Sequence, residues 1–165
     1  MKYGLVLGLV IVFLLGSLAT LVFSELQPVI SQNTNLVYTI TGYNNERLSP
    51  SDWVKKENIK VYKDRIVIEI PDTIIAEFSD TNSMDPLLDA GTNGIEIVPQ
   101  SPDQIQAGDI IAYDSDQGVI IHRVIEKGTD RDGVYFITKG DNNREADPEK
   151  VRFEQVRRVL IALIY

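Results

Sequence analysis

An apolar stretch near the N-terminus, residues 4–23, is the feature that most constrains how this chain can fold. It carries no charged side chain and has about the 20 residues that an α-helix needs to cross a hydrocarbon core of ~30 Å. A cleaved secretory signal has a shorter apolar region of about 7 to 15 residues followed by small residues. This stretch instead ends in Leu-Val-Phe-Ser at residues 21–24, which favours a retained transmembrane helix.

The charges beside this stretch predict its orientation. Lys2 precedes it and Glu25 follows it, so the positive-inside rule places the N-terminus in the cytoplasm. No later apolar run is long enough to span a bilayer, because residues 159–164 fit a buried strand. We therefore expect a single-pass membrane protein in which residues 1–26 form the anchor and residues 27–165 form one domain on the outer face.

The rest of the chain consists mostly of short runs that are typical of β-strands. Each run alternates apolar and polar residues, or is apolar throughout, and is bounded by Gly, Pro, Asp or Asn. The predicted strands are residues 59–62, 65–70, 73–78, 94–98, 109–113, 118–125, 133–139 and 156–165, the first two forming a hairpin. The fold class is therefore mainly β, a mixed and mostly antiparallel domain of one or two packed sheets.

Helix is expected only in two short places. Ser49 followed by Pro50 is typical of a helix start, which predicts a short helix over residues 49–57 with Trp53 as its inward-facing anchor. One further turn of helix is predicted in the connection formed by residues 99–108.

The composition excludes several kinds of site. The net charge of -8 argues against a nucleic-acid surface, because phosphate binding needs clustered Lys and Arg. The chain has no cysteine, so it has no disulfide, no thiolate zinc site and no cysteine nucleophile. With a single histidine and no acidic cluster at calcium-loop spacing, we expect neither a metal site nor a cofactor.

The single histidine, His122, lies between Ser83 and two downstream carboxylates, Asp141 and Asp147. A serine hydroxyl becomes a nucleophile when a base takes its proton, and the base in turn needs a third group to orient it. Ser83, His122 and one aspartate supply these three groups, which points to a serine peptidase. Either aspartate can reach the imidazole from the loop after the strand at residues 133–139, so the residues alone do not rank them.

Four short motifs make the interpretation more specific. They are Ser-Met-Asp-Pro at residues 83–86, Gly-Asp-Ile-Ile at 108–111, His-Arg-Val at 122–124 and Gly-Asp-Asn at 140–142. Together they resemble the motifs of type I signal peptidases, over about residues 83–147. The N-terminal part is similar to that family only in having a membrane anchor.

The resemblance also implies roles for individual residues. The bacterial branch of the family has a lysine base where this chain has His122, whereas the archaeal and endoplasmic-reticulum branch has a histidine there. This chain resembles the second branch, in which an aspartate several residues beyond Gly-Asp-Asn is the acidic partner. That position corresponds to Asp147, and Asp141 would be a supporting carboxylate. The implied partners are signal-peptide-bearing secretory preproteins, cut after small residues at the first and third positions before the scissile bond.

The chain departs from the family pattern at two places. Asn82 precedes Ser83 where the family more often has a small residue such as glycine. Residues 27–72 form a longer lead-in than is usual between anchor and nucleophile, so we divide the outer domain into this lead-in and a catalytic core, residues 73–165.

Two other functions remain as alternatives. One is a catalytically silent, membrane-tethered β domain that binds partner proteins, which would account for both departures. The other is a self-cleaving repressor-type peptidase on a related fold. That class normally uses Ser and Lys, so His122 and the membrane anchor argue against it.

Overall fold

The computed structural model describes residues 48–165, so the predicted anchor at residues 4–23 and the boundary at residue 26 lie outside the described residues. Within residues 48–165, no helix is long and apolar enough to cross a membrane. The described chain belongs to two compact units, one containing Lys56–Glu69 and the other containing residues 48–55 and Ile70–Tyr165. The two units are considered separately below.

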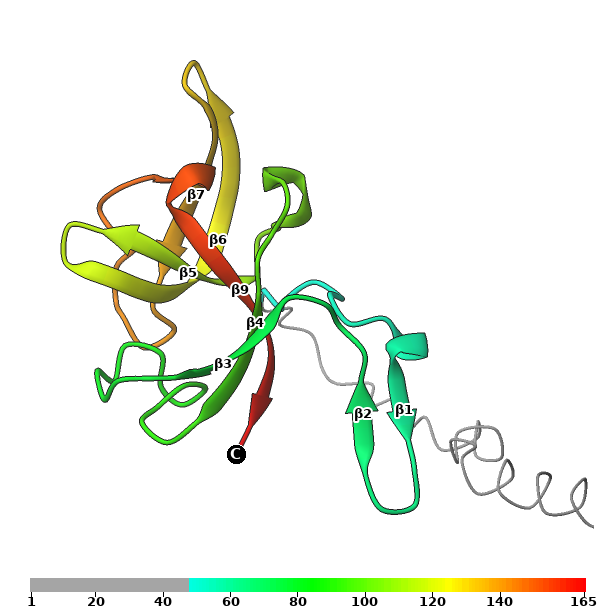
Figure 1. The fold of residues 1–165 in the computed structure, drawn as a ribbon. Helices are drawn as coiled ribbons and strands as arrows, with labels where there is room; N and C mark the ends of the chain where they lie inside the picture. The colour runs from blue at the N-terminus through cyan, green and yellow to red at the C-terminus, as the bar shows by residue number, and fades with distance from the viewer. Residues whose placement is uncertain (1–47) are drawn as a thin grey trace, which may run out of the picture. The chain divides into compact units, whose positions relative to one another are not determined.

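The smaller unit contains the predicted β-hairpin. A short 3-10 helix, η2 (Lys56–Asn58), leads into β1 (Ile59–Val61), which pairs antiparallel with β2 (Ile66–Ile68) (Figure 1). Ile59 pairs with Ile68 and Val61 with Ile66, so the connection falls where the sequence predicts it, around Lys63 and Asp64. The hairpin prediction is confirmed.

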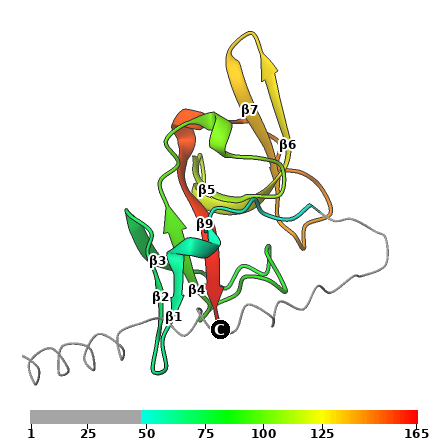
Figure 2. The same ribbon diagram turned by 90° about the vertical axis from the view of Figure 1, so that its right-hand side faces the viewer.

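The larger unit is one seven-stranded sheet in which every pairing is antiparallel. Its strands are β3 (Thr73–Glu77), β4 (Asn93–Ile97), β5 (Ile110–Ser115), β6 (Gly118–Asp130), β7 (Gly133–Lys139), β8 (Val151–Arg152) and β9 (Val156–Ile164). They are ordered β3-β4-β9-β5-β6-β7-β8, so the C-terminal strand β9 lies between β4 and β5. Figure 2 shows the outer part of the β6–β7 ribbon extending beyond the neighbouring strands. The expectation of a mainly β fold is confirmed, except that the two-residue strand β8 was not predicted.

Two clusters of buried side chains form the core of the larger unit. The first cluster contains Ile105, Ile111, Tyr113, Val124, Phe136, Val151 and Val159. The second contains Met84, Leu88, Ile110 and Leu160. Strand β5 contributes to both clusters because successive side chains of a strand point to opposite faces. Met84 belongs to the second cluster, so the loop that carries the neighbouring Ser83 is anchored in the core.

The predicted helix over residues 49–57 is wrong for its first part. Residues 48–53 have no regular secondary structure, and η2 begins only at Lys56. The amide of Ser51 donates to the carboxylate of Asp109 at 2.6 Å, so a long-range acceptor takes the place that the Ser49 hydroxyl would have as a helix cap. Trp53 does face inward, as predicted, and packs against the first core cluster. The helical turn in the later connection is confirmed as η3 (Pro102–Gln104).

Gly108 and Asp109 hold this N-terminal segment against the sheet. Asp109 is fully buried, and its carboxylate accepts hydrogen bonds from Ser51 N, Ser51 Oγ, Trp53 Nε1 and Gln106 N at 2.6, 3.3, 3.1 and 2.8 Å. Gly108 has a φ of 108°, and a Cβ at this position would collide with the carbonyl oxygen of Ser49. The Gly-Asp pair of the Gly-Asp-Ile-Ile motif is therefore a structural clamp.

We predict that Asp109→Ala destabilises the protein by about 3 kcal/mol or more, because four partly buried hydrogen bonds lose their shared acceptor at once. The midpoint and slope of urea unfolding would measure the change. Asp103→Ala is a suitable control, since Asp103 is exposed in the same connection and its carboxylate accepts no hydrogen bond from a described residue. Equal effects of the two substitutions would contradict the role of Asp109 as a clamp.

Candidate active site

Ser83 lies in the loop between β3 and β4, where the backbone makes a sharp turn. Asn82 just before it has a φ of 56°, the left-handed conformation that glycine adopts freely and that asparagine tolerates better than most residues. Met84 just after it is 3% exposed. Asparagine can thus supply the left-handed residue that the turn before Ser83 requires.

The Gly-Asp-Asn motif after β7 holds the Ser83 loop in place. The amide of Asn142 donates to the carbonyl oxygen of Ser83 at 3.0 Å, and its side-chain Nδ2 donates to the carbonyl oxygen of Asn82 at 2.9 Å. Gly140 lies so close that a Cβ there would be 2.5 Å from the Ser83 carbonyl oxygen. Glycine and asparagine are thus required for the two loops to touch.

His122 lies on β6, opposite Ile111 of β5, and is 6% exposed. Its Nδ1 is 2.7 Å from Oδ2 of Asp147. The loop that carries Asp147 is tied to β7, because the Asp147 amide donates to the carbonyl oxygen of Thr138 at 2.8 Å. An ionised carboxylate only accepts hydrogen bonds, so Nδ1 is the protonated nitrogen and Nε2 is left as the acceptor.

Tyr113 and Thr138 complete the hydrogen-bond network around the Asp147 carboxylate. The Tyr113 hydroxyl donates to the same Oδ2 at 2.9 Å, and the Thr138 hydroxyl donates to the Tyr113 oxygen at 3.2 Å. Burial raises the pKa of Tyr113, and the negative charge of Asp147 raises it further, while the Thr138 hydrogen bond opposes the shift. Tyr113 therefore remains a hydrogen-bond donor, and it binds the same carboxylate oxygen as the imidazole.

Asp141 has a different partner. Its carboxylate forms a two-point ion pair with Arg123, whose Nε and Nη2 are 2.7 Å from Oδ1 and Oδ2. Arg123 also donates from Nη1 to the carbonyl oxygen of Gly108 at 2.8 Å. The structure thus brings His122 together with Asp147 and places Asp141 on an arginine that links two loops.

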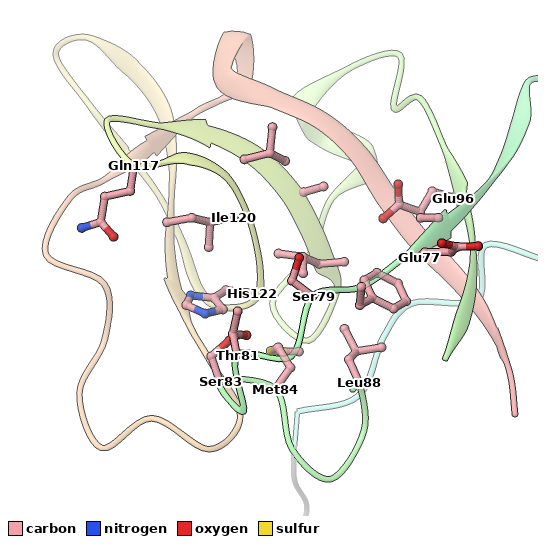
Figure 3. A pocket seen from close by; sticks show the side chains of 15 residues that line it. Glu77, Ser79, Thr81, Ser83, Met84, Leu88, Glu96, Gln117, Ile120 and His122 are labelled. Atoms are coloured by element: carbon pink, nitrogen blue, oxygen red, sulfur yellow. The ribbon is translucent and has the colours of Figure 1, made fainter. Parts of the chain in front are cut away.

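Ser83 and His122 line the same cavity, which has a volume of about 470 Å³ (Figure 3). Strand β3, the Ser83 loop, β5 and β6 provide most of its walls. The Ser83 Oγ is 3.2 Å from Oγ1 of Thr81. Within residues 48–165 no hydrogen bond joins Ser83 Oγ to the imidazole, so the two groups must come closer for proton transfer. In unliganded active sites such contacts are often long.

The arrangement provides the parts for acyl transfer: a hydroxyl, an imidazole oriented by a carboxylate, and a cavity that both line. In the described part of the chain, no group of three or more His, Cys, Asp or Glu side chains is placed to hold a metal ion. Sequence reasoning missed Tyr113 and Thr138. The only available signal was the antiparallel pairing of neighbouring strands, which brings Tyr113 near the strand of His122.

The comparisons with known proteins give a partial similarity. Signal peptidase I W of Bacillus subtilis is 34% identical over 80 residues, 47% of this chain and 41% of that protein. Uncharacterized protein MJ0260 of Methanocaldococcus jannaschii is 46% identical over 44 residues, 27% of this chain and 22% of that protein. The chain thus spans less than half the length of these curated relatives. No family model matches, and no solved structure matches. The chain is distantly similar to a signal peptidase I over part of its length.

We predict that Tyr113→Phe leaves the absorbance titration of tyrosine unchanged through the ordinary range around pH 10, because the pKa of Tyr113 lies above its usual value of 10.0. The folded-state pKa exceeds the unfolded one, so the stability from this hydroxyl is fully present below pH 10.0 and is lost as the pH rises toward the folded-state pKa. The ultraviolet difference spectrum of the tyrosinate measures the titration. Tyr165→Phe, which removes a ring that is 82% exposed, is the control. A lost ionisation near pH 10 in Tyr113→Phe would contradict the burial of its hydroxyl.

Proposed function

We propose that this protein is a membrane-anchored serine endopeptidase that removes signal peptides from translocated proteins, cutting after small residues. One observation carries the proposal: the His122 Nδ1 is held on Asp147, which leaves Nε2 available in a cavity that Ser83 also lines. The partial similarity to a signal peptidase I supports the choice of substrate. In this proposal Ser83 is the nucleophile, His122 the general base and Asp147 the orienting carboxylate.

The reaction follows from these positions. Neutral His122 takes the proton of Ser83 through Nε2 as Oγ attacks the scissile carbonyl carbon, and the bond from Oγ to carbon forms. Asp147 stabilises the imidazolium. The imidazolium then gives its proton to the leaving amine as the peptide carbon–nitrogen bond breaks. A water molecule, activated by the same imidazole, hydrolyses the acyl-enzyme and regenerates Ser83.

The backbone around Ser83 offers donors for the oxyanion. Among the described residues, the amides of Ser83 and Met84 donate to no acceptor, although Met84 is buried. Amides in such a position stabilise the negative oxygen of a tetrahedral intermediate by about 3 kcal/mol per donor. The anchored turn at Asn82 and Met84 would keep both amides in place.

A histidine base agrees with the archaeal and endoplasmic-reticulum branch of the signal peptidases, to which we assign the protein. Its partners would be secretory preproteins bound as extended chains beside a strand, on the outer face of the membrane. The supporting role for Asp141 is to hold Arg123, which links the Gly140 loop to Gly108. The N-terminal anchor would place the site close to membrane-inserted signal sequences.

The second candidate is a catalytically silent, tethered β domain that binds partner proteins. One observation favours it: Ser83 Oγ interacts with Thr81 instead of the imidazole. A silent domain would keep the fold and the cavity but would not depend on the hydroxyl of Ser83.

Replacement of the proposed triad should abolish cleavage. We expect Ser83→Ala and His122→Ala each to lower kcat by about 1000-fold or more, and Asp147→Asn by about 100-fold or more, because the three act as a unit. The assay follows cleavage of a preprotein with small residues at the first and third positions before the cut, in membranes containing the full chain. Ser79→Ala, at an exposed serine on the same cavity, is the matched control. Cleavage that survives Ser83→Ala would overturn the mechanism, and a wild type without activity would favour the silent domain.

Acidification should also lower the rate. A histidine base acts only when neutral, so we expect kcat/KM to fall steadily as the pH drops from about 8 to 5. The profile is measured on the same substrate, with circular dichroism at each pH as a control for folding. A flat profile over that range would rule out His122 as the base.

A further inference from the structure

The cavity that contains Ser83 and His122 also has a buried acid in its wall. Glu96 on β4 is 4% exposed and lines this cavity. Within residues 48–165, its carboxylate accepts no hydrogen bond and has no basic side chain within 4.0 Å. Among the described residues, no buried side-chain oxygen lacks a hydrogen-bond partner, so the Glu96 carboxylate is not sealed in the core and its oxygens reach the cavity.

The surroundings of Glu96 are mostly apolar. Leu160 of β9 is its direct partner in the sheet, and Phe78 and Leu88 line the cavity with it. Burial raises the pKa of Glu96, and the positive charge of Arg158 opposes the shift. Arg158 lies on β9, beyond ion-pair distance of Glu96, and it does not line the cavity. Its charge therefore acts on the carboxylate from a distance and leaves the cavity side of Glu96 open to a ligand.

A second acid adds to the negative charge of this part of the cavity. Glu77, at the end of β3, is exposed and lines the same cavity. Figure 3 shows Glu77 and Glu96 on one side of the cavity and Ser83 and His122 on the other. A ligand that extends from Ser83 along the cavity therefore meets two carboxylates, one of them buried.

We propose that Glu96 is the specificity-determining residue of this cavity and that it binds a Lys or Arg side chain of the peptide, N-terminal to the scissile bond. This inference rests on the proposed function. A substrate cation would give the buried carboxylate the partner that the described residues do not supply, and charge-assisted hydrogen bonds of this kind are stronger than neutral ones. Phe78 and Leu88, which line the cavity with Glu96, would bury the aliphatic part of the same side chain.

The geometry of an extended peptide limits the position of that side chain. Alternate residues of a strand point to the same side, and each residue advances by about 3.3 Å. If the residue before the cut faces the cavity beside Ser83, the third and fifth residues before the cut face it too, about 7 and 13 Å further along. The proposed substrate has a small residue at the third position, so the basic side chain should be preferred at the fifth position, and the even positions should show no preference.

The test measures binding separately from cleavage. The full chain carrying Ser83→Ala, in detergent, is titrated with fluorescent peptides that hold alanine before the cut and Lys, norleucine, Gln or Glu at each of positions two to five. We expect Lys at position five to bind at least about tenfold more tightly than norleucine or Gln, and Glu to bind most weakly. Adding Glu96→Gln should remove the preference for Lys and leave the affinity for an all-alanine peptide within about twofold.

Two further variants are matched controls. Glu77→Gln removes an exposed carboxylate from the same cavity, and the preference for Lys should persist. Arg158→Gln removes the nearby positive charge, and the preference for Lys should increase.

A preference for Lys that survives Glu96→Gln would overturn the inference, as would its absence from the protein with Glu96 intact. If Glu96→Gln fails to fold, the comparison of Lys with norleucine decides alone, because equal binding of the two would overturn the proposal.

The two proposals can fail separately in this design. Glu96-dependent binding of Lys peptides that the protein with intact Ser83 does not cut would overturn the peptidase mechanism and keep the role of Glu96. Cleavage that depends on Ser83 but ignores the residue at position five would keep the peptidase and overturn the role of Glu96.

Discussion

Strand β5 is the element on which the rest of the larger unit depends. It pairs with β6 along one edge and with β9 along the other, so Ile111 is flanked by His122 and Val159. Its first four residues are all buried, and they contribute to both core clusters. Because β5 is fixed from both edges and both faces, His122 on its neighbour and Tyr113 on β5 itself have fixed positions. The Asp147 carboxylate is then held between two side chains that cannot move independently.

The position of Ser83 depends on a second constraint, the contact between two loops. Met84 anchors one side of the Ser83 loop in the core, and Asn142 donates to the backbone on the other side. The contact requires the absence of a side chain at Gly140 and a left-handed residue at Asn82. These are backbone requirements, so the Gly-Asp-Asn motif has a structural reason that is independent of any chemistry. Asp141 within it is used to bind Arg123.

Much of this arrangement follows from the sequence, and the exceptions have physical reasons. The strands were predictable because their apolar residues alternate or run together between turn residues. The irregular backbone over the first part of residues 49–57 was not predictable. There the amide of Ser51 donates to the carboxylate of Asp109, which is 58 residues away in the sequence. The two aspartates could not be ranked, since both lie in the loop after β7, and the choice depends on their separate long-range partners, Tyr113 and Arg123. Glu96 escaped notice because a glutamate in a strand usually marks the solvent face.

The buried acids Asp109 and Glu96 and the partly buried Asp147 differ in how many hydrogen bonds the chain itself gives them. Asp109 accepts four hydrogen bonds, all from residues outside the candidate active site. Asp147 accepts two, one of them from the imidazole that it orients. Glu96 accepts none from the described residues, yet it is 4% exposed. Buried polar groups are hydrogen-bonded in the great majority of cases. The number of hydrogen bonds that each carboxylate accepts falls from Asp109 in the scaffold to Asp147 beside the imidazole, and again to Glu96 in the cavity wall. The Glu96 carboxylate reaches the cavity, so a cation of the substrate can pair with it there, and this pairing would be a source of selectivity in the complex.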